Sequence, residues 1–214
     1  MPDIRFRPVD RLLLSVDALL RLLPGKPPNT AADPASPLPD ATDLTPAERQ
    51  HAAALMRVNH AGELAAQGLY LGQSLTARAP QTLARLRAAG AEEAAHVDWC
   101  RARLRALGSR GSLLDPAWFG GALAIGTCAG LAGDGWSLGF MAETERQVET
   151  HLDDHLQRLP TGDLRSRAVL EHMRRDETRH GEDARRAGGR PLPAPVRGLM
   201  RLASRVMTTI AYRL

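Results

Sequence analysis

The chain has 214 residues, a formal net charge of +4, two cysteines and 4% aromatic residues. This length accommodates one helical domain of four to six helices with a sizeable core. Cys100 and Cys128 are too few for a disulfide framework or a four-thiolate metal site, so a reducing compartment is the default expectation. No segment alternates β-branched and polar residues as a strand would, and the composition therefore predicts an all-α protein.

The positive charge is concentrated at the C-terminal end. Residues 190–214 contain five arginines and no acidic residue, which leaves the rest of the chain close to neutral. A localised basic segment of this kind favours an anionic membrane surface as a partner. The chain lacks interleaved aromatic and basic residues and zinc-finger spacing, so we expect no nucleic-acid partner.

Residues 1–44 are expected to stand apart from the main domain, as an amphipathic helix followed by a proline-rich linker. Residues 10–23 place leucines at helical spacing opposite charged residues, which predicts the helix. Asp10 and Asp17 interrupt the apolar core that a signal peptide needs. Residues 24–44 contain six prolines and are expected to form an extended linker with no core of its own.

Residues 45–214 predict a single helical-bundle domain. Thr45-Pro46-Ala47-Glu48 is typical of an N-cap, a first-turn proline and a capping-box glutamate, so a helix is expected from there to about residue 78. Pro80 is expected to begin a second helix that ends near residue 108. Further helices are expected over residues 118–133, 134–160, 163–188 and 195–212. The apolar run over 118–133 is 16 residues long. Because roughly 20 residues are needed to cross a bilayer, this run is expected to be a buried or interfacial helix capping the bundle.

Two Glu-x-x-His steps are the most informative pattern in the chain. Glu93-Ala-Ala-His96 lies in the second expected helix, and Glu177-Thr-Arg-His180 lies in the helix over 163–188. A step of three residues returns both side chains to one helix face. Two further helices each carry a glutamate at a matching place, and together four carboxylates and two imidazoles are the ligand set of a di-iron site in a bundle core. The candidate metal ligands are therefore Glu63, Glu93, His96, Glu145, Glu177 and His180.

These acids lie in apolar stripes, where surface carboxylates are not expected. Glu93, for example, falls in register with Leu86 and Val97 at steps of three and four residues. Burying an ionised carboxylate costs several kcal/mol, and four of them in one core repel one another. Two divalent cations would neutralise that charge, and mixed carboxylate and imidazole ligands suit iron or manganese. The pattern therefore predicts a dinuclear metal site.

Two other histidines also follow a glutamate closely in the sequence. Glu48-Arg49-Gln50-His51 also has the spacing of a Glu-x-x-His step, but its place at a helix start is explained by capping. His151 follows Glu145 by six residues and is a candidate for a partner that orients a ligand. The alternative for His151 is a partly buried structural histidine.

Three segments carry a family resemblance. They are Leu55-Met56-Arg57-Val58-Asn59-His60-Ala61-Gly62-Glu63, Leu69-Tyr70-Leu71-Gly72-Gln73, and the ending from Arg205-Val206-Met207 to Tyr212-Arg213-Leu214. Together with the spacing of the acids, they resemble the demethoxyubiquinol hydroxylases of ubiquinone biosynthesis. The likeness covers most of residues 45–214.

This resemblance implies a ferritin-like four-helix bundle whose two iron ions use O₂ to hydroxylate the ring of a polyprenyl benzoquinol. It implies the same six iron ligands that the helical pattern selects, and an assisting role for His151. It also implies a peripheral protein on the cytoplasmic face of a bacterial cell membrane. The expected last helix supports this, because an apolar face that includes Leu199 and Val206 lies beside arginines at four-residue steps, as in an interfacial helix. The alternative for this helix is a bundle helix with a solvated arginine face.

Two other functions use a similar ligand set. Ferritin-like iron storage predicts a large hollow shell, which a basic and apolar C-terminal segment suits poorly. Rubrerythrin-like peroxide reduction would call for a four-cysteine centre, whereas the chain has two cysteines. A homo-oligomer, other proteins of ubiquinone biosynthesis as partners, and manganese in place of iron are alternatives that the sequence leaves open.

Overall fold

The computed structural model describes residues 32–39 and 44–214. Within these residues the chain forms six α-helices and no strand, which confirms the all-α class. The helices are α2 (Pro46–Thr76), α3 (Pro80–Ala106), α4 (Asp115–Leu131), α5 (Asp134–Arg158), α6 (Leu164–Arg186) and α7 (Ala194–Ala211). Each expected helix from residue 45 onward is found, with its ends within a few residues of the prediction. The helix expected over 10–23 lies outside the described residues.

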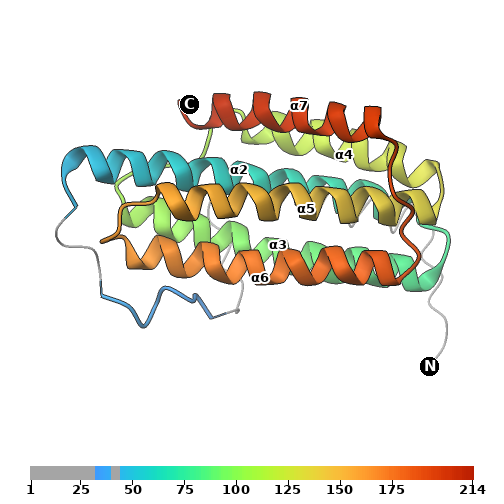
Figure 1. Cartoon of the computed structure of the whole chain (residues 1–214), viewed down its shortest axis with the longest axis horizontal. Coiled ribbons are helices and arrows are strands. Elements are labelled where there is room, and N and C mark those ends of the chain that lie inside the picture. Colours follow the sequence, from blue (N-terminus) through green and yellow to red (C-terminus); the bar gives the residue numbers. More distant parts are fainter. Residues whose placement is uncertain (1–31, 40–43) are drawn as a thin grey trace.

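Four of the helices form a bundle, and two more cover one side of it. Figure 1 shows α2 and α5 running alongside each other, with α3 and α6 on one side of them and α4 and α7 on the other. Helix α2 packs mainly against α4 and α3, and α5 packs mainly against α6. This arrangement confirms a ferritin-like four-helix bundle with additional helices.

Local sequence signals determine where the bundle helices begin. The hydroxyl of Thr45 accepts a hydrogen bond from the Glu48 amide at 3.2 Å, and the Glu48 carboxylate accepts one from the Thr45 amide at 2.9 Å. This is the predicted capping box. The Asp134 carboxylate, at the start of α5, accepts hydrogen bonds from the amides of Arg78 and Ala79 at 3.0 and 2.7 Å. The link between α2 and α3 is thereby fixed to the start of α5.

Glycines allow α4 to lie very close to α2. A Cβ atom added at Gly72 would collide with the backbone of Leu123, and one added at Gly126 would collide with the backbone of Leu69. The two helix backbones therefore contact each other directly along this stretch. Helix α4 runs along α2 rather than across the end of the bundle. In the described ranges each helix is too short or too polar to pass through a bilayer.

The bundle core consists of two apolar clusters with a gap between them. One cluster includes Leu55, Leu104, Leu152 and Leu170, and the other includes Tyr70, Leu86, Leu138 and Ala184. On α2, α5 and α6 the candidate metal ligands fall between the residues of the first cluster and those of the second, and on α3 Glu93 does so while His96 lies beside Ala95 of the first cluster. The polar candidates therefore occupy the middle of the bundle, enclosed by apolar side chains at both ends.

Part of the proline-rich segment also packs on the bundle. Ala35 is buried in the first cluster, and Arg165 donates a hydrogen bond to the Leu38 carbonyl at 2.7 Å. Within the described residues 32–39, Ala35 thus contributes to the core of the bundle.

Candidate metal centre

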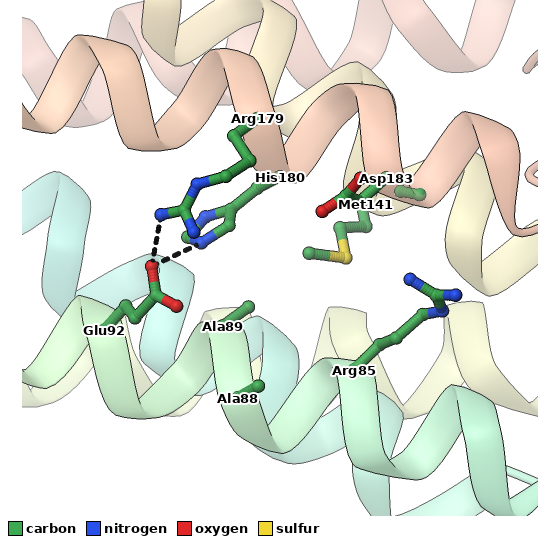
Figure 2. Close-up of a pocket in the computed structure, with 9 residues that line it drawn as sticks. Arg85, Ala88, Ala89, Glu92, Met141, Arg179, His180 and Asp183 are labelled. Atoms are coloured by element: carbon green, nitrogen blue, oxygen red, sulfur yellow. Dashed lines mark hydrogen bonds and ion pairs between the residues drawn. The ribbon is translucent and has the colours of Figure 1, made fainter.

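A cavity between α3 and α6 leads from the surface toward the middle of the bundle. Its volume is about 150 Å³. Arg85, Ala88 and Arg179 are exposed at its mouth, whereas Met141 and His180 are buried at its inner end (Figure 2). The cavity therefore ends at one of the six candidate ligands.

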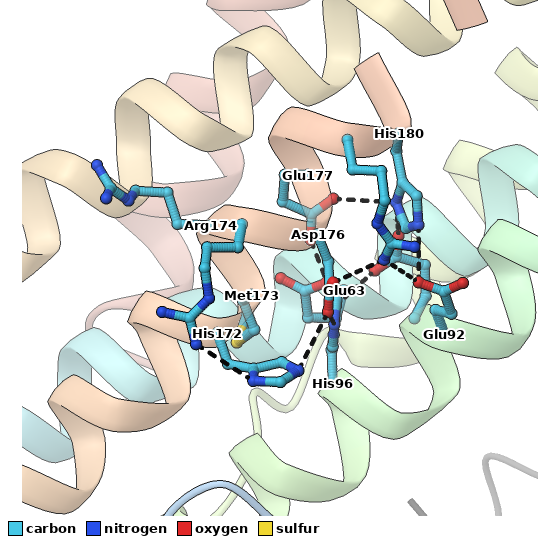
Figure 3. Close-up of polar contacts among 12 residues, drawn as sticks. Glu63, Glu92, His96, His172, Met173, Arg174, Asp176, Glu177 and His180 are labelled. Atoms are coloured by element: carbon cyan, nitrogen blue, oxygen red, sulfur yellow. Dashed lines mark hydrogen bonds and ion pairs between the residues drawn. The ribbon is translucent and has the colours of Figure 1, made fainter. Parts of the chain in front are cut away.

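All six candidates meet behind this cavity. Their exposed fractions do not exceed 6%. Figure 3 shows Glu177 and His180 on α6 turned toward His96 on α3. Two groups offer one ligand atom per residue within 4.8 Å of one another, and they are Glu63, Glu93, His96 and Glu177, and Glu93, Glu145, Glu177 and His180. Glu93 and Glu177 belong to both groups, so their carboxylates can bridge two metal ions.

Both imidazoles turn the Nδ1 atom toward the carboxylates. The Nδ1 atom of His96 lies 3.1 Å from Glu93, 3.3 Å from Glu177 and 3.5 Å from Glu63. The Nδ1 atom of His180 lies 3.5 Å from Glu93, 3.6 Å from Glu177 and 3.8 Å from Glu145. Each histidine thus presents one nitrogen to a set of three carboxylates.

Several buried polar atoms of this cluster have no hydrogen-bond partner among the described residues. They are both carboxylate oxygens of Glu145 and of Glu177, Oε1 of Glu93, and Nδ1 of His180. An unpartnered buried polar atom costs about 1–3 kcal/mol, and native proteins satisfy such atoms with a partner, a water or an ion. Carboxylate oxygens and imidazole nitrogens form the donor set that binds iron and related divalent metals. The cluster can therefore hold metal.

In the metal-free protein, protons compensate for the buried acids. Burial raises the pKa of Glu63 and the pKa of Glu145 well above their ordinary values. Burial lowers the pKa of His180, but Glu177 and Glu93 beside it outweigh this effect and raise the pKa to about 11. Burial also raises the pKa of Glu93, yet the nearby imidazoles of His180 and His96 bring it below its ordinary value. Metal ions would take the place of these protons.

The Nε2 atom of each of these two histidines, which points away from the carboxylate cluster, contacts an acidic residue of the other helix. The Nε2 atom of His96 lies 3.1 Å from the Asp176 carboxylate, and the Nε2 atom of His180 lies 3.0 Å from the Glu92 carboxylate. Asp176 directly precedes Glu177 on α6, and Glu92 directly precedes Glu93 on α3. Each acid therefore orients the histidine that lies on the other helix, which is the arrangement that fixes ring orientation in metal sites.

Arg179 joins the two orienting acids. Its Nη2 atom donates to the Glu92 carboxylate and to the Asp176 carboxylate, each at 2.6 Å. Reasoning from the sequence missed Glu92, Asp176 and Arg179. A signal was present, because an acidic residue stands immediately before the glutamate of both Glu-x-x-His steps.

His151 lies apart from these contacts. Its ring centroid is 3.8 Å from that of His155, which in turn lies 3.0 Å from the Asn59 side chain. Its Nε2 atom is buried without a hydrogen-bond partner in the described part of the chain, and burial lowers the pKa of His151 to about 4. A role in orienting a ligand stays a prediction for this residue.

A helical bundle that buries four carboxylates and two imidazoles at its centre defines the class of bundle-core metal proteins. The family model described as ubiquinone biosynthesis protein COQ7 matches residues 50–211. The chain belongs to this family. The matched span contains the six candidate ligands, the two orienting acids and the cavity.

Curated relatives match nearly the whole chain. The 3-demethoxyubiquinol 3-hydroxylase of Cupriavidus metallidurans is 58% identical over 207 residues, which cover 96% of this chain and 100% of the relative. The 3-demethoxyubiquinol 3-hydroxylase of Xanthomonas campestris pv. campestris is 54% identical over 212 residues, covering 99% of this chain and 97% of the relative. These relatives confirm the family that the sequence motifs indicate.

Proposed function

We propose that this chain is a 3-demethoxyubiquinol 3-hydroxylase that uses two iron ions and O₂. Relatives of that name match almost from end to end, and the chain buries a carboxylate and histidine cluster able to hold metal. The observation that carries the proposal is this cluster, since its unpartnered carboxylate oxygens are buried in the middle of the bundle. It supplies the ligands that a metal-dependent hydroxylase needs.

The proposed iron ligands are Glu63, Glu93, His96, Glu145, Glu177 and His180. Glu93 and Glu177 would be shared between the two ions. When bound, two ferrous ions would supply the two electrons that, with two protons from solvent, reduce one oxygen atom of O₂ to water while the other is inserted into a C–H bond of the quinol ring. Asp176 and Glu92 hold the two imidazoles in place, and the two apolar clusters exclude water from either end.

We further propose that the substrate reaches the protein from a membrane surface, because α7 exposes apolar residues. The exposed fractions of Leu199, Leu202 and Val206 are 68%, 58% and 48%. Arg197, Arg201 and Arg205 are exposed on the same helix. Apolar and basic side chains exposed together favour the interface of an anionic bilayer, where a polyprenyl tail also partitions.

Helix α4 extends this apolar surface. Ile125 and Leu131 are 48% and 62% exposed, and Trp118 of α4 packs in one cluster with Ala211 of α7. Both helices cover α2 on the side of the bundle away from α3 and α6 (Figure 1). This placement supports a peripheral protein, proposed to lie on the cytoplasmic face of a bacterial membrane, with its polar cavity directed away from the lipid.

Quinone profiling by mass spectrometry tests the substrate. Deleting the gene is expected to cause accumulation of the demethoxy precursor, and the wild-type gene is expected to restore the mature quinone. Glu177→Ala should fail to restore it, because it removes a carboxylate shared by both groups. Glu171→Ala, on the same helix but outside the ligand groups, should restore it. An unchanged quinone profile in the deletion strain would contradict the proposal.

The two alternative functions make different predictions in solution. An iron-storage protein would assemble into a large shell, which size-exclusion chromatography with mass detection would reveal. A peroxide reductase would consume hydrogen peroxide in the absence of quinol. We expect neither behaviour, and quinol-dependent O₂ consumption instead.

A further inference from the structure

The cavity between α3 and α6 reaches only one of the two ligand groups. His180 is among the residues that line it, whereas Glu63 and His96 are not. His180 belongs to the group with Glu145, and His96 belongs to the group with Glu63. The cavity therefore approaches one proposed metal position from outside and leaves the other enclosed.

The imidazole of His180 forms the wall between the cavity and the cluster. Its Nε2 atom lies 3.0 Å from Glu92, which lines the cavity, while its Nδ1 atom faces Glu93 and Glu177 at 3.5 and 3.6 Å. The Nδ1 atom is buried and has no hydrogen-bond partner among the described residues. A metal ion bound at Nδ1 would thus be separated from the cavity by one side chain.

The surroundings of the two histidines differ in exposure. The His180 side chain is 7% exposed and its partner Glu92 is 40% exposed. The His96 side chain is 1% exposed and its partner Asp176 is 18% exposed. The outer side of His180 is therefore less deeply covered than the outer side of His96.

The cavity is lined by charged side chains of both signs and can hold water. The carboxylates of Glu92 and Asp183 both face it, and the thioether of Met141 lies at its inner end (Figure 2). A volume of about 150 Å³ is large enough for several water molecules. Arg85 and Arg179 line the cavity as well, so its acidic and basic side chains balance, and the assignment of the cavity depends on its position beside His180 rather than on its charge.

We propose that this cavity is the port through which a divalent metal ion enters and leaves the group formed by Glu93, Glu145, Glu177 and His180. The ion in this group therefore exchanges faster than the ion held with His96. The inference rests on the proposed metal centre and adds the route and the order of metal exchange.

Chelator extraction tests this order. The wild-type protein is loaded with Fe(II) without oxygen and mixed with ferrozine, and the iron complex is followed by its absorbance. We expect the iron to be released in two phases, with one ion released in each phase. Asp176→Ala, which removes the acid that holds His96, should accelerate the slow phase, and Glu92→Ala should accelerate the fast phase. These two variants assign the phases to the two groups.

A bulky residue at the mouth tests the route. Ala88 is exposed and lines the cavity, so Ala88→Trp can narrow the mouth without repacking the core. It should slow the fast phase about tenfold and leave the slow phase unchanged. Ala84→Trp is the matched control, because Ala84 is exposed one turn earlier on α3 and does not line the cavity.

The outcomes separate this inference from the proposed function. Two ions leaving the wild-type protein in a single phase would overturn the port, as would an Ala88→Trp variant that slows both phases equally or neither. If the wild-type protein binds no iron at all, the proposed metal centre itself fails. Two bound ions with equivalent exchange would refute the port and leave the metal centre intact.

Discussion

The Nε2 atom of His96 on α3 lies 3.1 Å from the carboxylate of Asp176 on α6. His180 and Glu92 repeat this relationship in the opposite direction, at 3.0 Å. At the Nε2 atom, each histidine is held by an acid of the other helix. Both helices must therefore pack in the correct register before either imidazole presents its Nδ1 atom to the carboxylates.

Removing an orienting acid is expected to weaken metal binding. Loss of such a partner typically lowers metal affinity about 10–100-fold. Asp176→Ala should have this effect on one of two Co(II) ions in a titration followed by visible absorption. Asp176→Asn, which keeps an oxygen that can accept a hydrogen bond, should recover part of the affinity. Asp153→Ala is the control, since Asp153 is 47% exposed and pairs with Arg174 away from the cluster. Equal affinities in Asp176→Ala and the control would contradict the assigned role.

The metal-free protein is expected to lose stability as the pH rises above neutrality. The pKa of His180 is about 11 in the folded protein and ordinarily 6.5, so its proton favours the folded state. This contribution is complete below pH 6.5 and is lost progressively as the pH rises toward 11. The raised pKa values of Glu63 and Glu145 act in the same direction.

Thermal unfolding followed by circular dichroism between pH 7 and 9 measures this effect. The melting temperature of the metal-free protein should fall with pH, and His180→Gln should flatten the dependence. Metal ions compete with the same protons, so metal affinity should rise over this range. A melting temperature of the metal-free protein that rises with pH would contradict the prediction.

Acidic substitutions on α7 are expected to weaken membrane binding strongly. Burying a leucine side chain contributes about 1.5–3 kcal/mol, and Leu199 and Leu202 are among the most exposed apolar residues described. The double variant Leu199→Glu, Leu202→Glu should lose most binding to anionic vesicles in a flotation assay. Leu164→Glu is the matched control, because Leu164 is 47% exposed on α6, on the other side of the bundle. Equal loss in the control would show that these substitutions do not probe a specific surface.

A side chain added between α2 and α4 is expected to destabilise the fold. A Cβ atom at Gly126 would collide with the backbone of Leu69, so Gly126→Ala should lower the free energy of unfolding by about 1–3 kcal/mol. Gly120→Ala on the same helix meets nothing within 4 Å and should be neutral or stabilising, since alanine favours the helix. Chemical denaturation compares the two. Equal stability of both variants would mean that the close approach of the helices contributes little.

Most of the fold could be predicted because its signals are local. The capping box at Thr45, the proline that begins α3 and the apolar stripes containing Glu93 and Glu177 all depend on residues within a few turns of one another. The same periodicity identifies the six residues that the structure brings together. Their role as iron ligands remains a proposal.

What the sequence did not reveal depends on contacts between helices. Glu92 and Asp176 lie next to the apolar stripes that contain Glu93 and Glu177, and not within them. From the sequence alone, each is therefore expected to be a surface acid, and its role becomes visible only when α3 and α6 are packed together. The cavity is lined by small residues of both helices, such as Ala89 on α3 and Ala184 on α6. The burial of Ala35 depends on how the proline-rich segment folds back, and no local pattern specifies it.

The exchange of orienting acids between α3 and α6 has a consequence for protein engineering. A Glu-x-x-His step transplanted on a single helix would lack the carboxylate that orients its histidine, because that carboxylate belongs to the other helix. The acid that precedes the step would in turn have no histidine to orient in the new protein. The smallest unit that can be grafted is therefore the helix pair, and a gene duplication that copied one helix alone would yield no working half-site.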